Sequence, residues 1–502
     1  MSNVLLVLTD QSRDVGPWDG DALRAFREGL PTRRRLDRAA RRFRQHRTAS
    51  AACVPSRVSL FTGTSPWVHG VSQTDGMAKE AGDQGMTWLS PQGVPTLGHR
   101  LQAAGHETVY IGKWHLSHPA DGRLEPWGFH GWQGPEPHGA DPANSGVSRD
   151  PGFVQQAEDW LRARAAGASE APFFLVVSLV NPHDIVFWPA WSLWARRRLA
   201  LEGIPALGPG PSAADTPTEE PSTLRAYREH YLRAYAPPAI TRALYAGQAD
   251  RYRRFYASLL SRVDAHVGSL LDTLEETGLA ADTHVVVTSD HGELLGAHGG
   301  LHQKFYNAFE ETLRVPLWIR YADGRYAGNR VETPTDHLDL APTLLGLAGV
   351  DPRQPPGRGG GDGWPALRGR DLSGSIAERD SYFVTLDSIL DGESRQALVG
   401  RALPWLGARL PLRYGPLPSP NPAVECVVAG VPDATGRPEA WKLIRYFHPS
   451  RPAGAESDEW SLYRLDADPC ERSDLSRHAA SHAVLHVLRA RLDQARRAAG
   501  GP

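Results

Sequence analysis

Short apolar runs that end in polar residues recur along the chain and predict the strands of a sheet. Runs of this kind are typical of strands that are buried on both faces of a parallel sheet. Between them, Thr96–Ala104 and Ala249–Thr277 carry apolar residues at helical spacing, and the second segment is long and amphipathic. Helices of this type pack one face onto a sheet. The strand candidates are Val4–Leu8, Glu107–Ile111, Phe173–Val180 and His284–Thr288.

The pattern predicts an α/β fold in which a large, mostly parallel or mixed sheet lies between helices. We expect a main domain over residues 1–375, with an insertion at about 187–247, where tryptophan-rich and Pro/Gly/Ala-rich segments interrupt the pattern. Residues 376–502 are predicted to form a smaller C-terminal subdomain. A small antiparallel sheet and a terminal amphipathic helix are expected there, from Ala440–Phe447, Trp460–Leu465 and His478–Ala498.

Two further segments have more than one interpretation. Arg33–Arg47 is strongly basic and has apolar residues at helical spacing. A solvated helix with one apolar stripe is favoured over a nucleic-acid patch, because no aromatic residues or further basic stripe support binding. Trp188, Trp191 and Trp194 of the insertion either line a substrate mouth or pack the insertion onto the body, and packing is favoured.

Composition and charge indicate a soluble protein of a reducing compartment. The 502 residues carry a formal net charge of −2, which does not suggest nucleic acid or a charged membrane surface as the main partner. The three cysteines, Cys53, Cys426 and Cys470, are too few and too scattered for a disulfide framework or a zinc cluster. The first apolar run resembles a strand more than a signal peptide, and Phe173–Val180 is far shorter than the roughly 20 residues of a membrane helix. We expect a cytoplasmic protein with no membrane partner.

Polar residues with catalytic or ligand-binding potential directly follow each predicted strand. Because ligands of open α/β sheets bind beyond the carboxyl ends of the strands, we expect these side chains to share one crevice. Taken singly, each has an ordinary structural explanation, such as capping a turn or packing beside a tryptophan. The candidates are Asp10 and Gln11 after the first strand, Lys113 and His115 after the second, His183 after the third, and Asp290 and His291 after the fourth.

The segment Cys53–Arg57 is a second candidate centre. Pro55 stiffens a turn, Ser56 is placed to cap a helix, and Arg57 falls in the first turn of that helix. A helix N-terminus and a guanidinium group lower the pKa of a thiol, so a reactive Cys53 is expected, with a buried structural cysteine as the alternative. Only three residues separate Cys53 from Arg57, which argues against the Cys-x5-Arg phosphatases.

The sequence around Cys53 also resembles a family signature. Cys-x-Pro-Ser-Arg, with Thr62 and Gly63 a few residues later, is similar to the motif of the type I sulfatases, in which this cysteine is oxidised to formylglycine after synthesis. Further blocks occur in family order, and the resemblance covers most of the chain. It implies an alkaline-phosphatase-like fold and the hydrolysis of a sulfate ester to an alcohol and sulfate. The blocks are Gly112–Leu116, Asn181–Asp184, Ser289–Glu293, Lys304 and Glu310–Leu317.

The resemblance implies a divalent metal ion as cofactor. Asp10, Gln11, Asp290 and His291 are similar to the family's ligands, and the modified Cys53 would complete the shell. Oxygen-dominated ligands favour a hard ion, so Ca²⁺ is expected first and Mg²⁺ or Mn²⁺ next. The implied partners are a small-molecule or saccharide sulfate ester and a maturation enzyme that generates formylglycine.

The resemblance also implies roles for the cationic residues. Arg57 and Lys113 would stabilise the hydrate of the formylglycine aldehyde, one hydroxyl of which attacks the sulfur atom. His115 would take the proton that drives release of sulfate from the covalent adduct, a role that suits an imidazole near neutral pH. His183 and Lys304 would bind sulfate oxygens and help the alcohol to leave.

Two positions depart from the common family pattern. Most sulfatases carry Asp-Asp after the first strand and Asp-Asn at the later position, whereas this chain has Asp10-Gln11 and Asp290-His291. One formal negative charge is therefore missing from the metal shell. The Asp-Gln pair is more similar to choline-sulfatase-like enzymes and to phosphonate monoester or phosphodiester hydrolases, which share the formylglycine. Such a hydrolase is one alternative, and a catalytically silent anion- or metal-binding relative is another.

Overall fold

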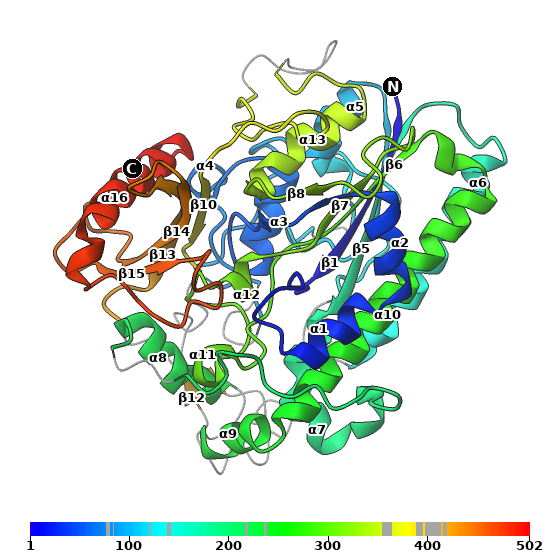
Figure 1. Ribbon diagram of the computed structural model, residues 1–502. Coiled ribbons are helices and arrows are strands. Elements are labelled where there is room, and N and C mark those ends of the chain that lie inside the picture. Colours follow the sequence, from blue (N-terminus) through cyan, green and yellow to red (C-terminus); the bar gives the residue numbers. More distant parts are fainter. Residues whose placement is uncertain are drawn as a thin grey trace.

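Two sheets organise the molecule: a large one in the main body and a small one near the C-terminus (Figure 1). Helices cover both faces of the large sheet, and the small sheet lies beside this body with the terminal helix on its outer side (Figure 1). The computed structural model describes residues 1–502 except 77–80, 84, 120–121, 138–141, 216–218, 235–237, 354–363, 388–394, 397–412 and 415–418.

The large sheet is the mixed sheet that the apolar runs predict. Within the described residues its strand order is β4-β5-β1-β6-β7-β2-β8. The first four strands run parallel, β7 is antiparallel to β6, and β2 is antiparallel to β7. The expected fold class is therefore confirmed. The strands are β4 (Glu107–Gly112), β5 (Phe173–Pro182), β1 (Asn3–Asp10), β6 (Thr283–Ser289), β7 (Leu317–Arg320), β2 (Arg41–Phe43) and β8 (Arg330–Val331).

The central strand β1 is covered on both faces, which explains its continuous apolar sequence. Val4, Leu6 and Leu8 pack into the core below α3, α5 and α13. Leu5 and Val7 point to the opposite face and pack against α2, α6 and α10. The covering helices are α3 (Cys53–Thr62), α5 (Leu97–Ala103) and α13 (Leu340–Leu347) on one face, and α2 (Pro31–Ala39), α6 (Gly146–Ala165) and α10 (Ala249–Glu276) on the other.

The predicted insertion contains short helices, of which Trp188–Trp194 packs against α10. Trp188 and Trp191 are buried, and the Trp188 ring contacts Tyr252 and Phe255 of α10. These two tryptophans therefore pack the insertion onto the body, while the Trp194 side chain lies outside the described structure.

No helix of the described part is both long and apolar enough to cross a membrane. Further short helices among the described residues are α1 (Asp21–Glu28), α4 (Pro66–His69), α7 (Trp188–Trp194), α8 (Ser222–His230), α9 (Pro238–Ala246), α11 (Ala297–Gly300) and α12 (Glu310–Leu313).

The C-terminal region forms the small antiparallel sheet with a terminal helix that the sequence predicts. Leu488 and Leu492 of α16 pack on one face of this sheet. Its other face, including Phe383 and Ile444, packs against the loops of the main body. The boundary after residue 375 stays a prediction. The elements are β10 (Ser381–Thr385), β13 (Ala423–Pro432), β14 (Pro438–Phe447), β15 (Glu459–Arg464) and α16 (His482–Ala498), with two short pairs elsewhere, β3 (His46–Arg47) with β9 (Thr335–Asp336) and β11 (Arg395–Gln396) with β12 (Arg413–Tyr414).

The predicted helix over Arg33–Arg47 is wrong in its second half. The helix α2 ends at Ala39, and the segment Arg41–Phe43 then forms β2. The chain becomes extended at Ala40 (φ −123°, ψ 161°), so it can join the sheet beside β7. The spacing of apolar residues along the chain does not report that β7 is available as a pairing partner for Arg41–Phe43.

The expected solvated basic face is confirmed only in part, since Arg34 and Arg38 of α2 are exposed but other basic residues of the segment are not. Arg33, Arg42 and Arg47 are all buried. The first two pair with Asp14, and Arg47 pairs with Glu310 at 2.8 Å. Their acidic partners come from other parts of the chain, which is why the sequence pattern alone suggests exposure.

Candidate active site

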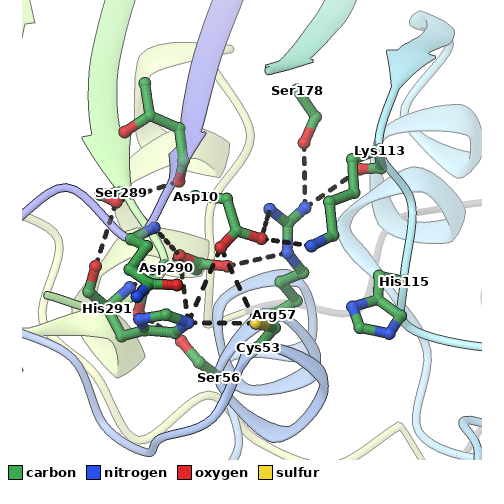
Figure 2. Close-up of polar contacts among 12 residues, drawn as sticks. Asp10, Cys53, Ser56, Arg57, Lys113, His115, Ser178, Ser289, Asp290 and His291 are labelled. Carbon is green, nitrogen blue, oxygen red and sulfur yellow. Dashed lines mark hydrogen bonds and ion pairs between the residues drawn. The ribbon is translucent and has the colours of Figure 1, made fainter. Parts of the chain in front are cut away.

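The carboxyl ends of β1 and β6 lie side by side and bring Asp10 next to Asp290 (Figure 2). The backbone N–H of Gln11 donates to Asp290 Oδ1 at 3.0 Å. Cys53, the first residue of α3, reaches the same place. Its Sγ lies 3.1 Å from His291 Nε2 and 3.8 Å from Asp10 Oδ1. Residues from three separate segments therefore form one site.

Four side chains of the described structure are grouped as a metal ion would require. One possible ligand atom from each of Asp10, Cys53, Asp290 and His291 lies within 4.8 Å of the others, and all four residues are buried. Two carboxylates supply the negative charge that a divalent cation needs, and an imidazole nitrogen is a common ligand beside them. The donor set fits a divalent ion.

The His291 ring is oriented as in a metal ligand. Its Nδ1 lies 3.0 Å from the carbonyl oxygen of Gly292, so Nδ1 carries the proton and donates it there. The lone pair of Nε2 then faces Cys53 Sγ and the carboxylates. Burial lowers the pKa of His291, so the ring stays neutral and able to bind a cation.

Asp10 is ionised although it is completely buried. Burial alone would raise the pKa of its carboxyl group, but the charges of Lys113, His183, Arg57 and His291 outweigh burial and hold this pKa well below its usual range. Lys113 Nζ lies 2.6 Å and Arg57 Nη2 lies 3.0 Å from Asp10 Oδ2. Both cations contact Oδ2, and Oδ1 is the atom within 3.8 Å of the sulfur.

The expectation of a lowered thiol pKa is wrong. Burial and the charge of Asp10 raise the pKa of Cys53 to about 12. The guanidinium of Arg57 cannot reverse this effect, because it is already paired with Asp10 and Asp290. The Cys53 thiol therefore stays protonated near neutral pH, and the unmodified side chain is not a thiolate nucleophile.

Ser56 does not cap the helix as expected. The helix α3 begins at Cys53 with Ala52 at its N-cap, so Ser56 lies inside the first turn. Its Oγ donates to the backbone oxygen of Asp290 at 2.6 Å and lies 3.0 Å from Thr48 Oγ1. Ser56 thus fastens the start of α3 to the segment that follows β6.

Arg57 bridges the two carboxylates of the site (Figure 2). Its Nε donates to Asp290 Oδ2 at 2.9 Å, and its Nη2 donates to Asp10 Oδ2 at 3.0 Å. Its Nη1 donates to Ser178 Oγ and to the backbone oxygen of Lys113. Each nitrogen of the group is engaged, so Arg57 positions the aspartates. Its predicted contact with the aldehyde hydrate stays a prediction.

His115 lies beyond Lys113, apart from the carboxylate cluster (Figure 2), and has two acidic neighbours that the sequence analysis missed. Its Nε2 lies 2.7 Å from Asp75 Oδ1. The backbone N–H groups of Trp114 and His115 both donate to Glu136 Oε2 at 3.2 Å, and burial raises the pKa of Glu136 to about 7. Both acids lie in loops outside the recognised blocks, so no sequence signal pointed to them.

The remaining predicted residues reach the site from other segments. His183 follows β5, and its charge contributes to the low pKa of Asp10. Lys304 Nζ donates to Gln11 Oε1 at 3.0 Å. The amide nitrogen of Gln11 donates to Glu293 Oε2. Nine of the ten predicted residues thus lie in this cluster or interact with it, whereas His115 lies beyond Lys113. The catalytic roles of the predicted residues and the ligand role of Gln11 stay predictions.

Comparisons with known proteins agree with this geometry. A family model described as Sulfatase matches residues 2–350. The chain is 28% identical over 381 residues to the choline-sulfatase of Rhizobium meliloti (strain 1021), with 69% of this chain and 68% of the relative covered. It is 29% identical over 420 residues to a multifunctional alkaline phosphatase superfamily protein of Trinickia caryophylli, with 71% and 76% covered. The solved phosphonate monoester hydrolase from Silicibacter pomeroyi shares the fold, with a TM-score of 0.62, 21% identity, and 99% of this chain and 95% of that chain covered.

The mixed sheet between helices, with buried aspartates, a histidine and a cysteine near its carboxyl edge, has the alkaline-phosphatase-like fold. The match over residues 2–350 is more specific, and the chain belongs to the sulfatase family. It is a sulfuric ester hydrolase, which converts a sulfate ester to an alcohol and sulfate. The family resemblance and the activity that it implies are confirmed.

Proposed function

We propose that this sulfatase acts through a formylglycine, which is formed from Cys53, and through a bound divalent metal ion. Ca²⁺ is the first candidate for this ion, and Mg²⁺ or Mn²⁺ is the next. Asp10, Asp290 and His291 would hold the ion, with Gln11 and the modified residue 53 completing the shell. One observation carries the proposal: Cys53 is buried beside two carboxylates, and its pKa is raised to about 12. A protonated sulfur is a poor nucleophile and a poor ligand for a hard ion, whereas the oxygen atoms of a hydrated aldehyde suit both tasks.

The hydrated aldehyde would carry two hydroxyl groups, of which one attacks the sulfur of the ester and the other later expels sulfate. A bound divalent ion would offset the negative charge that develops on the sulfuryl oxygens. Arg57 keeps the two ligand aspartates in place. Burial would lower the pKa of Lys113, but the charge of Asp10 outweighs it and raises this pKa. Lys113 therefore remains a cation next to position 53 and can stabilise the hydrate.

Proton transfer and leaving-group departure fall to the histidines and Lys304. His115 would accept the proton that starts the release of sulfate. The carboxylate of Asp75, 2.7 Å from the ring, would stabilise the imidazolium that results. His183 and Lys304 would bind sulfate oxygens and support the departing alcohol oxygen.

Mass spectrometry of the peptide that contains Cys53 tests the modification. The protein is produced with and without a formylglycine-generating maturation enzyme, which we propose as its partner. We expect an aldehyde in place of the thiol in the first preparation, and we expect hydrolysis of an aryl sulfate in proportion to the modified fraction. Equal activity of both preparations, with an intact thiol in the second, would contradict the proposal.

The identity of the metal is tested by chelation. Removal of divalent ions from the modified protein should abolish hydrolysis, and Ca²⁺ should restore more of it than Mg²⁺ or Mn²⁺ does. Restoration of activity by Mg²⁺ or Mn²⁺ alone would uphold the proposed metal site and replace Ca²⁺ as the identity of its ion. Full activity in the chelator, after metal analysis shows that no ion remains, would contradict a role for the metal.

A phosphonate monoester or phosphodiester is the second candidate substrate of the same site. The Asp10-Gln11 pair supports this candidate, because the pair is similar to that of phosphonate monoester or phosphodiester hydrolases as well as to that of choline-sulfatase-like enzymes. We propose a small-molecule or saccharide sulfate ester as the natural substrate. The names of two relatives, a choline-sulfatase and an N-acetylglucosamine-6-O-sulfatase, support these two classes. Relative rates on sulfate and phosphonate esters distinguish the two chemistries.

We also propose the cytoplasm as the location of the protein. Cys53, Cys426 and Cys470 are all buried and unpaired. A reducing compartment preserves this state. Fractionation of cells that express the full chain tests the proposal, and recovery of the mature protein outside the cytoplasm would contradict it.

A further inference from the structure

Glu293 ends the Ser-Asp-His-Gly-Glu block, and no step of the proposed reaction uses it. Its carboxylate is completely buried. Oε1 accepts hydrogen bonds from the Tyr252 hydroxyl and from the backbone N–H groups of Leu295 and Gln303, each at 2.9 Å. Oε2 accepts a hydrogen bond of 2.5 Å from Gln11 Nε2. A buried carboxylate is thus in direct contact with a proposed metal ligand.

Glu293 fixes the orientation of the Gln11 carboxamide. Both N–H groups of that amide are engaged, one with Glu293 Oε2 and the other with Gln303 Oε1 at 2.8 Å. A carboxylate accepts hydrogen bonds and cannot donate them, so the nitrogen of Gln11 must lie on this side. The oxygen then lies on the other side, where Lys304 Nζ donates to it at 3.0 Å.

The side of the amide that carries the oxygen belongs to the metal site. The ammonium group of Lys304 interacts electrostatically with both Cys53 and His291, so this lysine lies close to two members of the four-residue group. The backbone N–H of Gln11 donates to Asp290 Oδ1. A carboxamide oxygen accepts two interactions, so the contact with Lys304 leaves one lone pair for a cation.

We propose that Glu293 is a positioning residue of the metal site, which directs the Gln11 oxygen to the ion and supplies the negative charge that Gln11 lacks. This inference rests on the proposed function, since it presupposes an ion at Asp10, Asp290 and His291. A hydrogen bond to a carboxylate polarises the amide, and its oxygen becomes a stronger ligand. The chain thereby keeps the charge of a second acidic residue, one hydrogen bond behind the shell.

Glu293→Gln tests the charge and the orientation together. The variant retains an oxygen for the three donors at Oε1, but it places an amide nitrogen opposite Gln11 Nε2. To avoid two facing donors, the Gln11 amide must turn over, and its nitrogen then faces Lys304. Calorimetric titration of Ca²⁺ into the metal-free full-length protein should show binding weaker than wild type by about 10- to 100-fold.

The combined variant Gln11→Glu with Glu293→Gln exchanges the carboxylate and the amide and keeps the total charge. The amide introduced at position 293 can donate to the carboxylate introduced at position 11, which then faces Lys304. Gln303 can adapt, because its Nε2 has no hydrogen-bond partner among the described residues and can donate once that amide turns over. We expect this variant to bind Ca²⁺ at least as tightly as the wild type.

A matched control is Glu425→Gln. Glu425 is a completely buried glutamate of the small sheet that pairs with Arg445 and Arg496. This variant should be less stable but should bind Ca²⁺ with unchanged affinity. Unchanged affinity in Glu293→Gln would overturn the inference. A loss that the combined variant fails to restore would also overturn it, because Glu293 would then only support the fold.

The titration also separates this inference from the proposed function. It measures binding and does not require turnover or a modified Cys53. Absence of Ca²⁺, Mg²⁺ or Mn²⁺ binding by the wild type would contradict both the inference and the proposed metal site. Normal wild-type binding with the expected pattern among the variants, in a protein that never forms an aldehyde, would uphold the inference and contradict the proposed reaction.

Discussion

Arg57 Nε lies 2.9 Å from Asp290 Oδ2, and this pair ties the first turn of α3 to the end of β6 (Figure 2). The same guanidinium group contacts Asp10 at the end of β1. Two neighbouring carboxylates repel each other, and a cation between them offsets this repulsion. One buried arginine therefore prepares both aspartates for a divalent ion.

Arg57→Gln should lower both the stability of the protein and its affinity for a divalent ion. Removing one partner of a buried ion pair leaves an uncompensated charge and costs about 3–5 kcal/mol of the free energy of unfolding. Denaturant unfolding in the presence of a chelator measures this loss. Arg123→Gln is the control, because Arg123 forms an exposed pair with Glu125 that is worth at most about 1 kcal/mol. Equal stability of the two variants would contradict the bridging role.

Cys53→Ala should abolish turnover and leave the fold intact. Position 53 supplies the proposed nucleophile, and the substitution removes a single sulfur atom from the end of a helix. Aryl sulfate hydrolysis and circular dichroism measure the two effects. Cys426→Ala, in the small sheet where Cys426 is buried, is the control and should keep its turnover. Hydrolysis by the first variant at the wild-type rate would be incompatible with a nucleophile at residue 53.

Asp75→Asn should lower kcat by about tenfold and leave KM nearly unchanged. The variant keeps a hydrogen bond to His115 but loses the charge that stabilises the protonated ring, and general acid–base catalysis contributes about 10²–10⁴ in rate. A double-mutant cycle with His115→Ala checks that the effect passes through the imidazole. In the His115→Ala background, Asp75→Asn should have no further effect. A tenfold loss in that background as well would show that Asp75 acts in another way.

Glu136 should make the protein less stable as the pH rises from about 4.5 to about 7. Burial raises the pKa of Glu136 to about 7, and the unfolded chain restores the ordinary value of 4.5. Between these two pKa values the folded protein holds a proton that the unfolded chain releases, so a rising pH favours unfolding. The resulting loss in the free energy of unfolding is complete above about pH 7. Denaturant unfolding at about pH 5 and about pH 8 measures it. Glu136→Gln cannot ionise and should lose less stability than the wild type, whereas equal losses would contradict the raised pKa.

Much of the fold could be predicted because buried strands leave a clear sequence pattern. The run Val4–Leu8 lies within β1, and Phe173–Val180 lies within β5. Strand ends also placed Asp10 and Asp290 correctly at one edge. Since parallel strands end at the same edge, topology alone brings such residues together.

The parts that sequence could not predict depend on contacts between distant segments. The pKa of Cys53 is raised because Asp10 lies beside it, and no local pattern reports that distance. Arg47 is buried because Glu310 is available as a partner. Asp75 and Glu136 lie in loops, where neither periodicity nor a motif identifies a functional acid. Helix propensity and spacing describe neighbours along the chain, whereas these effects arise between segments.

The central claim is that this site hydrolyses sulfate esters through a modified Cys53. It is tested most directly by kcat/KM for an aryl sulfate, an aryl phosphonate and an aryl phosphate diester, measured on protein whose residue 53 is confirmed by mass as formylglycine. Cys53→Ala serves as the blank for all three substrates. A clear preference for the sulfate is expected. A preference for the phosphorus esters would contradict the claim and assign the protein to the phosphonate monoester or phosphodiester hydrolases.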